Sequence, residues 1–272
     1  MPNKASVIDD VRNAVLRQAA THPEDFYEAD LSRMRTSEWQ VKRFIVKAHA
    51  TGGENNAVTK AKEDLIQNLM WRKDVRIWER TESTFPDDFF RAGLIGAADC
   101  PITGNKVIYI NTKVYRKIPE MTEHFFAFGH TFLDRLDREA KGQRFTLFLD
   151  LSELELANAD VHFLRYYMEL MMYRFPLMLE RTYLYEPPWY IRPFVSVVLK
   201  VFPKSILKNV SMLDRKGAVD LLGLDAIPEG AGGRLCTDIP VPPSAPSSAV
   251  FAKQYGVPME AIEKARREYH LI

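Results

Sequence analysis

The feature that most constrains the fold is an alternation of short apolar segments with longer helical ones, which begins after Pro86. Residues 107–110, 145–151 and 182–185 are rich in β-branched and aromatic side chains, which favours β-strands. Between them, apolar residues recur with the period of a helix. Strands that alternate with helices are typical of an α/β domain with a mostly parallel sheet. Residues 145–151 are apolar at nearly every position, which predicts a strand buried on both faces.

The two ends of the chain have different patterns. Helical periodicity over residues 6–20, 37–49 and 57–73 predicts a small helical bundle. Residues 236–248 contain four prolines and several serines, which is typical of a linker, and a short helix is expected to start at Pro258. We therefore expect three parts: a helical N-terminal lobe over residues 1–80, an α/β domain over 81–235, and a linker with a C-terminal helix over 236–272.

Charge, cysteine content and hydropathy exclude several classes of protein. The formal net charge is only +1, which argues against a nucleic-acid-binding role. The two cysteines, Cys100 and Cys236, cannot form a disulfide framework and fit a reducing compartment. We expect neither a secretory signal in residues 1–20 nor a membrane span, because no apolar run approaches about 18 residues. These observations predict a cytoplasmic protein.

Catalytic motifs are absent from the sequence. Gly93 and Gly96 lack the third glycine of a dinucleotide-binding loop, and the six histidines are scattered, so we expect them in surface or capping positions. Asp150 follows an apolar strand, but the sequence offers it no partner base or nucleophile. We therefore expect no enzymatic activity, no cofactor and no metal site.

The charge is concentrated in one segment. Residues 189–216 carry six basic residues and one acidic residue, a net charge of +5, together with many apolar side chains that include Trp189 and Tyr190. A basic and apolar segment with flanking Trp and Tyr suits a lipid–water interface. A core helix with solvated lysines explains the same pattern, and the segment alone leaves both interpretations open.

A second unusual segment, residues 166–179, is apolar on almost all faces and contains four methionines. This pattern predicts a buried helix. Methionine also suits surfaces that accommodate variable apolar partners, but simple core packing is the default interpretation.

Several motifs occur in an order that resembles a known family. They are Trp71-Arg72 at the end of the helical bundle, Gly104-Asn105-Lys106-Val107 before a strand, Phe148-Leu149-Asp150-Leu151-Ser152, Phe175-Pro176, Tyr185-Glu186-Pro187-Pro188-Trp189, and Ile227-Pro228-Glu229-Gly230-Ala231-Gly232-Gly233. Together they resemble a CRAL-TRIO lipid-binding domain of the phosphatidylinositol-transfer-protein-like kind, over about residues 30–235. Within that family, residues 106–111 and the segment Glu186-Pro187-Pro188-Trp189 most resemble the CRAL-TRIO part of motile-sperm-domain-containing proteins.

The resemblance implies a fold and a site. The fold is α/β, with a helical N-terminal lobe, a mostly parallel, curved sheet, and helices that enclose an apolar pocket for one lipid. The implied lipid-pocket residues are Phe148, Tyr167, Met171, Tyr183 and Tyr185. By position, residues 189–202 match a mobile gate helix, which favours membrane contact for the basic segment. The implied gate and membrane residues are Trp189, Phe194, Val198, Lys200, Phe202 and Lys204.

The resemblance also implies a headgroup position, which this chain matches only in part. Lys216 is the headgroup candidate, whereas Leu177 replaces an acidic residue that members binding phosphatidylinositol commonly carry. We expect a cytoplasmic, peripheral membrane protein that binds a phospholipid or similar lipid and exchanges it at an anionic membrane surface. The alternative is a membrane-tethering or protein-interaction module that transfers no lipid, with a protein partner bound through the C-terminal segment.

Overall fold

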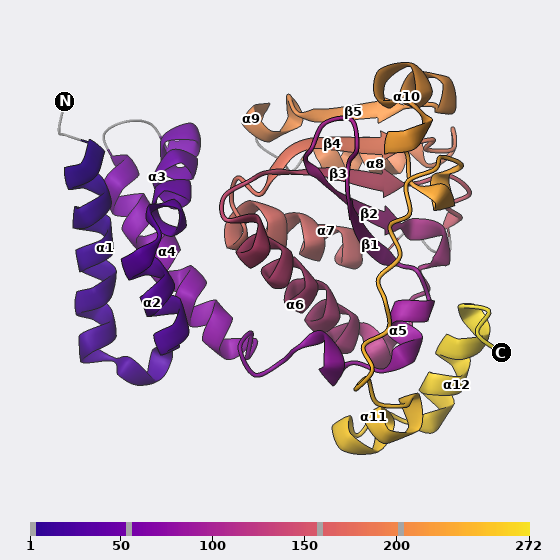
Figure 1. The fold of residues 1–272 in the computed structure, drawn as a ribbon, viewed down its shortest axis with the longest axis horizontal. Helices are drawn as coiled ribbons and strands as arrows, with labels where there is room; N and C mark the ends of the chain where they lie inside the picture. The colour runs from indigo at the N-terminus through magenta and orange to yellow at the C-terminus, as the bar shows by residue number, and fades with distance from the viewer. Residues whose placement is uncertain (1–3, 53–55, 157–159, 201–203) are drawn as a thin grey trace. The chain divides into compact units, whose positions relative to one another are not determined.

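The computed structural model describes residues 4–52, 56–156, 160–200 and 204–272, and its elements are labelled in Figure 1. The chain divides into two compact units. Unit 1 comprises Met1–Arg80, Asp134–Gly142 and Met168–Met178, and unit 2 comprises Thr81–Leu133, Gln143–Tyr167 and Leu179–Ile272. Residues 236–272, expected as a separate part, thus belong to unit 2, and two segments from beyond residue 80 belong to unit 1.

Unit 1 is helical, as the periodicity predicts. Its N-terminal helices are α1 (Lys4–Thr21), α2 (Glu28–Thr36), α3 (Glu38–Gly52) and α4 (Ala57–Asp74), with the short turn η1 (Pro23–Asp25) between α1 and α2. Helix α4 packs against α1 and α3 (Figure 1). Their apolar stripes form one core that includes Val15, Val41, Phe44 and Leu65. The sequence pattern does not predict α2, because that helix is short and buries only Asp30, Leu31 and Met34.

Buried ion pairs lie beside this core. The Arg72 guanidinium donates to Asp30 Oδ2 at 2.8 Å and to Asp134 Oδ1 at 2.7 Å. Arg43 contacts both carboxylate oxygens of Asp137 at 2.7 and 2.8 Å. Burial by itself raises the pKa of Asp134, but the neighbouring guanidinium groups, Arg72 foremost, hold that pKa below its ordinary value.

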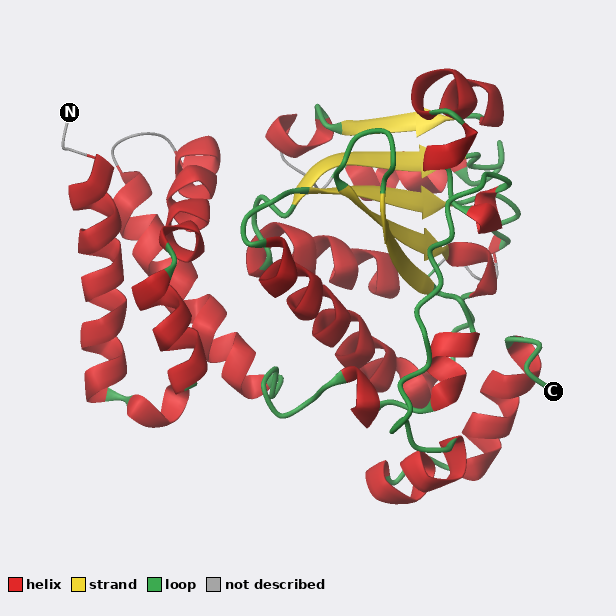
Figure 2. Ribbon diagram, viewed as in Figure 1, coloured by secondary structure: helices red, strands yellow, loops and turns green. Residues whose placement is uncertain are grey.

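Unit 2 contains a five-stranded sheet with the strand order β1-β2-β3-β4-β5 (Figure 2). The strands are β1 (Ile95–Asp99), β2 (Lys106–Asn111), β3 (Phe145–Asp150), β4 (Leu179–Tyr185) and β5 (Val210–Leu213). Strand β1 pairs antiparallel with β2, and every other pair is parallel. The predicted α/β class, with a helical N-terminal part and a mostly parallel sheet, is confirmed.

Helices connect the parallel strands, as crossover connections require. Helix α6 (Thr122–Ala140) joins β2 to β3, and α7 (Val161–Glu169) with the π-helical turn η7 (Leu170–Arg174) joins β3 to β4. Helices α8 (Arg192–Leu199) and α9 (Lys204–Leu207) join β4 to β5. Before the sheet lie η3 (Glu82–Thr84) and α5 (Asp87–Arg91), and between β2 and α6 lie η4 (Thr112–Val114) and η5 (Pro119–Met121). After β5 come α10 (Arg215–Leu222), η8 (Leu224–Ala226) and η9 (Glu229–Ala231).

The two faces of the sheet are covered by different elements. Because successive side chains of a strand point to opposite faces, neighbours such as Phe148 and Leu149 enter different cores. One core contains Tyr109 and Phe148 and is covered by Ala218 of α10. The other contains Leu184 and is covered by Val195 of α8.

The C-terminal segment, residues 236–272, packs on the rest of unit 2. The backbone N–H of Ala97 in β1 donates to the carbonyl of Thr237 at 3.0 Å. Gly96 permits this close approach, since a Cβ atom there would lie 2.0 Å from the Thr237 carbonyl oxygen. The segment contains α11 (Ser248–Tyr255) and α12 (Met259–Glu268). Phe251 in α11 and Tyr269, directly after α12, are buried. The segment therefore covers the free edge of the sheet, where an unpaired strand would invite association.

Candidate functional site

Helix α8 is the element on which the predicted gate residues fall, and local sequence explains where it begins. The turn at Pro187 and Pro188 precedes it, and the N–H of Ile191 donates to the Pro188 carbonyl at 2.9 Å. Pro193 lies in its first turn, where the missing N–H of proline costs nothing. Of the predicted span of residues 189–202, the helix contains Arg192–Leu199, and residues 201 and 202 lie outside the described residues.

One face of α8 is buried on the sheet and the other is exposed. Ile191 and Val195 recur at helical spacing and pack against Leu151, Leu154 and Leu184. The side chain of Val197 is 62% exposed and that of Trp189, just before the helix, is 79% exposed. Apolar side chains therefore lie on the solvent side of a helix that already buries its other face.

Basic residues follow the exposed apolar face. Lys200 caps the C-terminus of α8, where a cation is favourable, and Lys204 begins α9. Both side chains are exposed. Of the other predicted gate residues, Phe194 and Val198 are half-buried, and Phe202 lies outside the described residues.

The structure distributes the predicted pocket residues over three places. Phe148, Tyr183 and Tyr185 share the core on the sheet face opposite α8. Tyr167 in α7 donates its hydroxyl to the carbonyl of Phe125 in α6 at 3.1 Å. Met171, in η7, belongs to unit 1. Strand alternation places the first three on the face of the sheet away from α8, and the assignment of all five residues to a lipid pocket stays a prediction.

Hydrogen bonds satisfy the carboxylate of Asp150 at the end of β3. Asp150 is fully buried and accepts the Tyr109 hydroxyl at 2.8 Å and the Ser152 hydroxyl at 2.5 Å. Burial, and then the Asp150 carboxylate, raises the pKa of Tyr109. Burial and the neighbouring Glu186 carboxylate raise the pKa of Tyr185 to about 12. These tyrosines therefore stay neutral at physiological pH, and Asp150 holds the loop after β3, as a strand-end aspartate commonly does.

The headgroup candidate and its expected counterpart lie in different units. Lys216, on α10 of unit 2, contacts Asp220 at 2.5 Å, and its side chain is 84% exposed. Leu177 of unit 1 is half-buried and has a positive φ of 61°.

The expectation that the histidines occupy surface or capping positions is wrong for His130. This residue is 3% exposed, with its Nδ1 3.0 Å from the Tyr166 hydroxyl, because the apolar faces of α6 and α7 meet around it.

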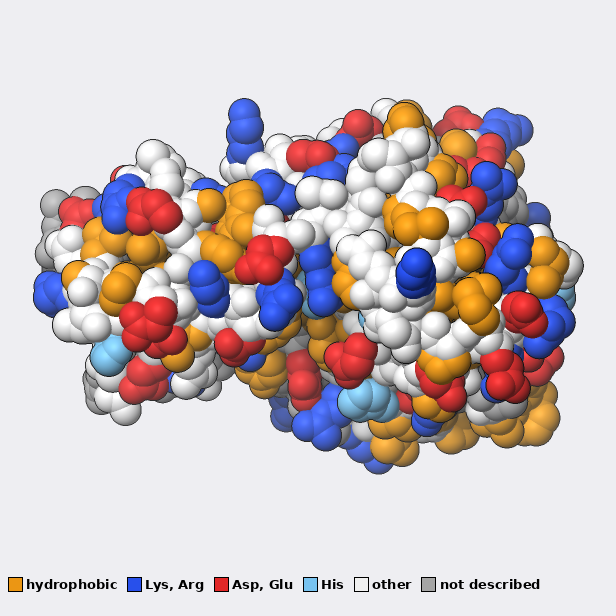
Figure 3. Space-filling model, turned by 90° about the horizontal axis from the view of Figure 1, so that it is seen from below, with side chains coloured by type: hydrophobic (Ala, Val, Ile, Leu, Met, Phe, Trp, Pro, Cys, Tyr) orange, Lys and Arg blue, Asp and Glu red, His pale blue; other side chains and the backbone are white. Residues whose placement is uncertain are grey.

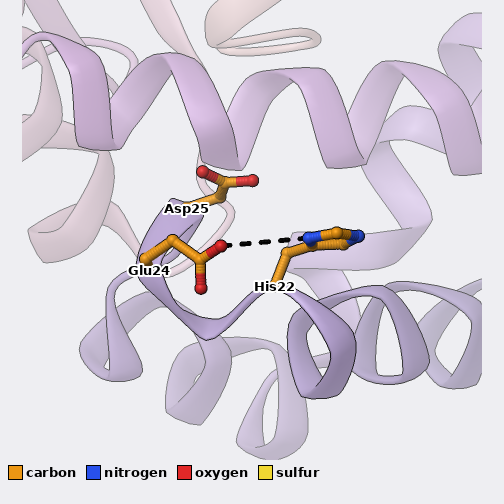
Figure 4. A group of neighbouring side chains, drawn as sticks. All are labelled: His22, Glu24 and Asp25. Carbon is orange, nitrogen blue, oxygen red and sulfur yellow. Dashed lines mark ion pairs between the residues drawn. The ribbon is translucent and has the colours of Figure 1, made fainter.

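A group of potential metal ligands lies in the turn after α1. His22, Glu24 and Asp25 bring ligand atoms within 4.8 Å of one another, and His22 Nδ1 lies 3.9 Å from Glu24 Oε1 (Figure 4). His22 and Glu24 are exposed, and exposed acidic groups ordinarily remain hydrated. We assign the group no function.

The comparisons with known proteins decide the family. The model of the CRAL/TRIO domain matches residues 96–233, from β1 to the loop after η9. The chain belongs to the CRAL-TRIO family. A solved structure described as the crystal structure of Sfh5 superposes with a TM-score of 0.59 at 14% sequence identity, over 93% of this chain and 98% of that one. It supports the same fold. Family membership assigns the chain to proteins that bind lipids or other small hydrophobic ligands.

Helix α8 lies within the residues that match the CRAL/TRIO domain. The sequence reveals the helical spacing of its apolar residues, but it does not reveal which of them are exposed to solvent. The sequence favours Val198, whereas the exposed valine is Val197. Arg192 and Arg215 contribute to the +5 charge, but no motif distinguishes them from the lysines. Among the described residues, no helix is long and apolar enough to span a bilayer.

Proposed function

We propose that this CRAL-TRIO protein binds a phospholipid or similar lipid in an internal apolar pocket and exchanges it at the surface of anionic membranes. We propose further that α8 is the mobile gate and that the protein is cytoplasmic, peripheral and non-enzymatic. The observation that carries the proposal is that α8 has apolar side chains on both faces. Val195 is buried against the sheet, and Val197 is exposed beside Lys200.

Physical chemistry supports a membrane role for such a helix. Exposed apolar side chains gain about 25 cal/mol per Å² when they leave water. Each lysine near an anionic surface adds about 1 kcal/mol. These terms are small enough to allow reversible binding, which a protein that collects and releases lipid requires. A helix that leaves the sheet to contact the bilayer would uncover the apolar surface that it now covers, which includes Leu151, Leu154 and Leu184, as a lid does in other proteins.

Flotation with vesicles that contain phosphatidylserine tests the membrane contact. Val197→Asp places a charge on the exposed face of α8 and should lower the bound fraction several-fold. Val250→Asp is the matched control, because Val250 is similarly exposed, at 55%, but lies on α11. Equal binding by both variants and the wild type would exclude α8 as the contact.

Lipid binding and lipid transfer need separate measurements. Native mass spectrometry of gently purified protein should detect a bound lipid, and a mass that corresponds to the chain alone would contradict the internal pocket. Transfer of fluorescent lipid from donor to acceptor vesicles should be slower with Val197→Asp than with Val250→Asp. Membrane binding without transfer would favour the alternative of a tethering module.

A further inference from the structure

The carboxyl ends of three neighbouring parallel strands of unit 2 surround an open cleft of about 590 Å³. We call it the carboxyl-edge cleft. Residues that follow β3, β4 and β5, namely Ser152, Glu186 and Arg215, line it, and so do Trp189 and Arg192 before and at the start of α8. Ligands of open parallel sheets bind in this position, beyond the carboxyl ends of the strands.

Two guanidinium groups of the cleft have no carboxylate partner within the described part of the chain. Arg192 donates through Nε to the Pro187 carbonyl at 3.3 Å, which leaves both terminal nitrogens of its fork available. The guanidinium of Arg215 lies beside Gly232, where a Cβ atom would come within 3.0 Å of Nη2. Gly232 has a φ of 83° and no side chain, so the chain passes close to Arg215 without displacing it.

The cleft is also lined by three acidic residues, and two of them accept hydrogen bonds from backbone N–H groups. Asp214 caps α10, with Oδ1 2.7 Å from the N–H of Gly217. Glu186 Oε1 accepts the backbone N–H of Arg215 at 3.3 Å. The third acid, Glu153, is exposed. The cleft therefore presents two arginine forks whose side chains form no ion pair with these acids.

A third cation lies in the same cleft. Lys113 Nζ donates to the carbonyl of Gly230 at 3.1 Å and lies 4.0 Å from the buried carboxylate of Asp150. Lys113 is thus held in place by backbone and buried charge, while Arg192 and Arg215 remain available to a ligand. Planar guanidinium groups match the oxygen geometry of phosphate better than an ammonium does.

We propose that the carboxyl-edge cleft binds a phosphate group through Arg192 and Arg215. The ligand is a small phosphate-bearing molecule or the headgroup of an anionic phospholipid, and in the second case Trp189 contacts the acyl region next to the headgroup. This site is separate from the internal apolar pocket of the proposed function. It also differs from the position of Lys216, which contacts Asp220 and is not among the residues that line the cleft.

Two binding measurements distinguish the sources of phosphate. Equilibrium dialysis with radiolabelled inorganic phosphate measures binding of the free ion. Flotation with phosphatidylcholine vesicles that contain phosphatidic acid measures binding of the lipid. The double variant R192Q/R215Q should weaken binding by at least about tenfold, because it removes charge-assisted hydrogen bonds. The matched control R234Q/R267Q removes two exposed arginines outside the cleft.

Each result decides one point. Loss of phosphate binding in R192Q/R215Q alone supports a site for soluble phosphate compounds, and loss of binding only to phosphatidic acid vesicles supports a headgroup site. Equal binding by the two double variants, or no binding of either probe by the wild type, overturns the proposal. Native mass spectrometry of R192Q/R215Q should still detect the co-purified lipid, so failure of this site is distinguishable from failure of the internal pocket.

Discussion

At the scale of single residues, Arg72 offers the sharpest prediction, because one side chain neutralises two buried carboxylates. Arg72→Met removes the guanidinium that contacts Asp30 at 2.8 Å and Asp134 at 2.7 Å, while Arg33 stays 3.8 Å from each carboxylate. The loss should lower the free energy of unfolding of unit 1 by about 3–5 kcal/mol. Urea unfolding followed by tryptophan fluorescence measures this, since three of the four tryptophans, Trp39, Trp71 and Trp78, lie in unit 1. The control is Arg76→Met, whose side chain is 69% exposed and should cost less than about 1 kcal/mol. Equal losses in the two variants would contradict the assignment.

The same residue scale limits what the sequence can predict about the site. The charge of Lys200 and the aromatic character of Trp189 are readable directly, and both side chains are exposed. The sequence does not predict which of Val197 and Val198 is exposed to solvent. A rotation of the helix by one residue would exchange the two positions. Strands have the same limit, because the register of β3 and β4 decides which face of the sheet receives Phe148 and Tyr183.

At the scale of elements, the local period predicts most helices and the central strands, because amphipathic spacing is a property of neighbouring residues. Strands β1 and β5 are not predicted. The first, Ile-Gly-Ala-Ala-Asp, has little β-propensity, and the second has only four residues. The C-terminal segment is predicted as a linker from its prolines, but its docking depends on contacts far apart in the chain, such as that of Thr237 with β1.

The packing of the C-terminal segment on the rest of unit 2 can be tested at Phe251. Phe251 of α11 is 1% exposed and packs near Phe89 of α5, with ring centroids 5.8 Å apart and the rings tilted by 54°. Phe251→Ala should cost about 3–5 kcal/mol and detach the segment. Limited proteolysis should then cleave residues 237–246 much faster than in the wild type. Val250→Ala, at the exposed neighbouring position of the same helix, should leave the cleavage rate unchanged. Slow cleavage in both variants would show that other contacts hold the segment.

At the scale of the whole molecule, charge is balanced overall and uneven locally. Acidic and basic side chains are interspersed on the face shown in Figure 3, and the formal net charge is +1. The segment over residues 189–216 carries +5. Because the Debye length is about 8 Å at physiological ionic strength, a bilayer responds to the charges near the contact rather than to the sum over the chain. The +1 total therefore does not exclude attraction of this segment to an anionic membrane.

If the charges near the contact control membrane attraction, binding should depend on salt concentration and on the position of the lysines. Binding of the wild type to vesicles with phosphatidylserine should fall several-fold between about 0.05 and 0.5 M salt, because screening removes the lysine contribution. K200E/K204E should bind weakly and with little dependence on salt. K253E/K264E changes the net charge by the same amount at exposed positions of α11 and α12, and it should behave like the wild type. Flotation over a salt series measures all three proteins. If both double variants lose binding equally, total charge rather than the α8–α9 surface controls membrane attraction, and the proposed contact is wrong.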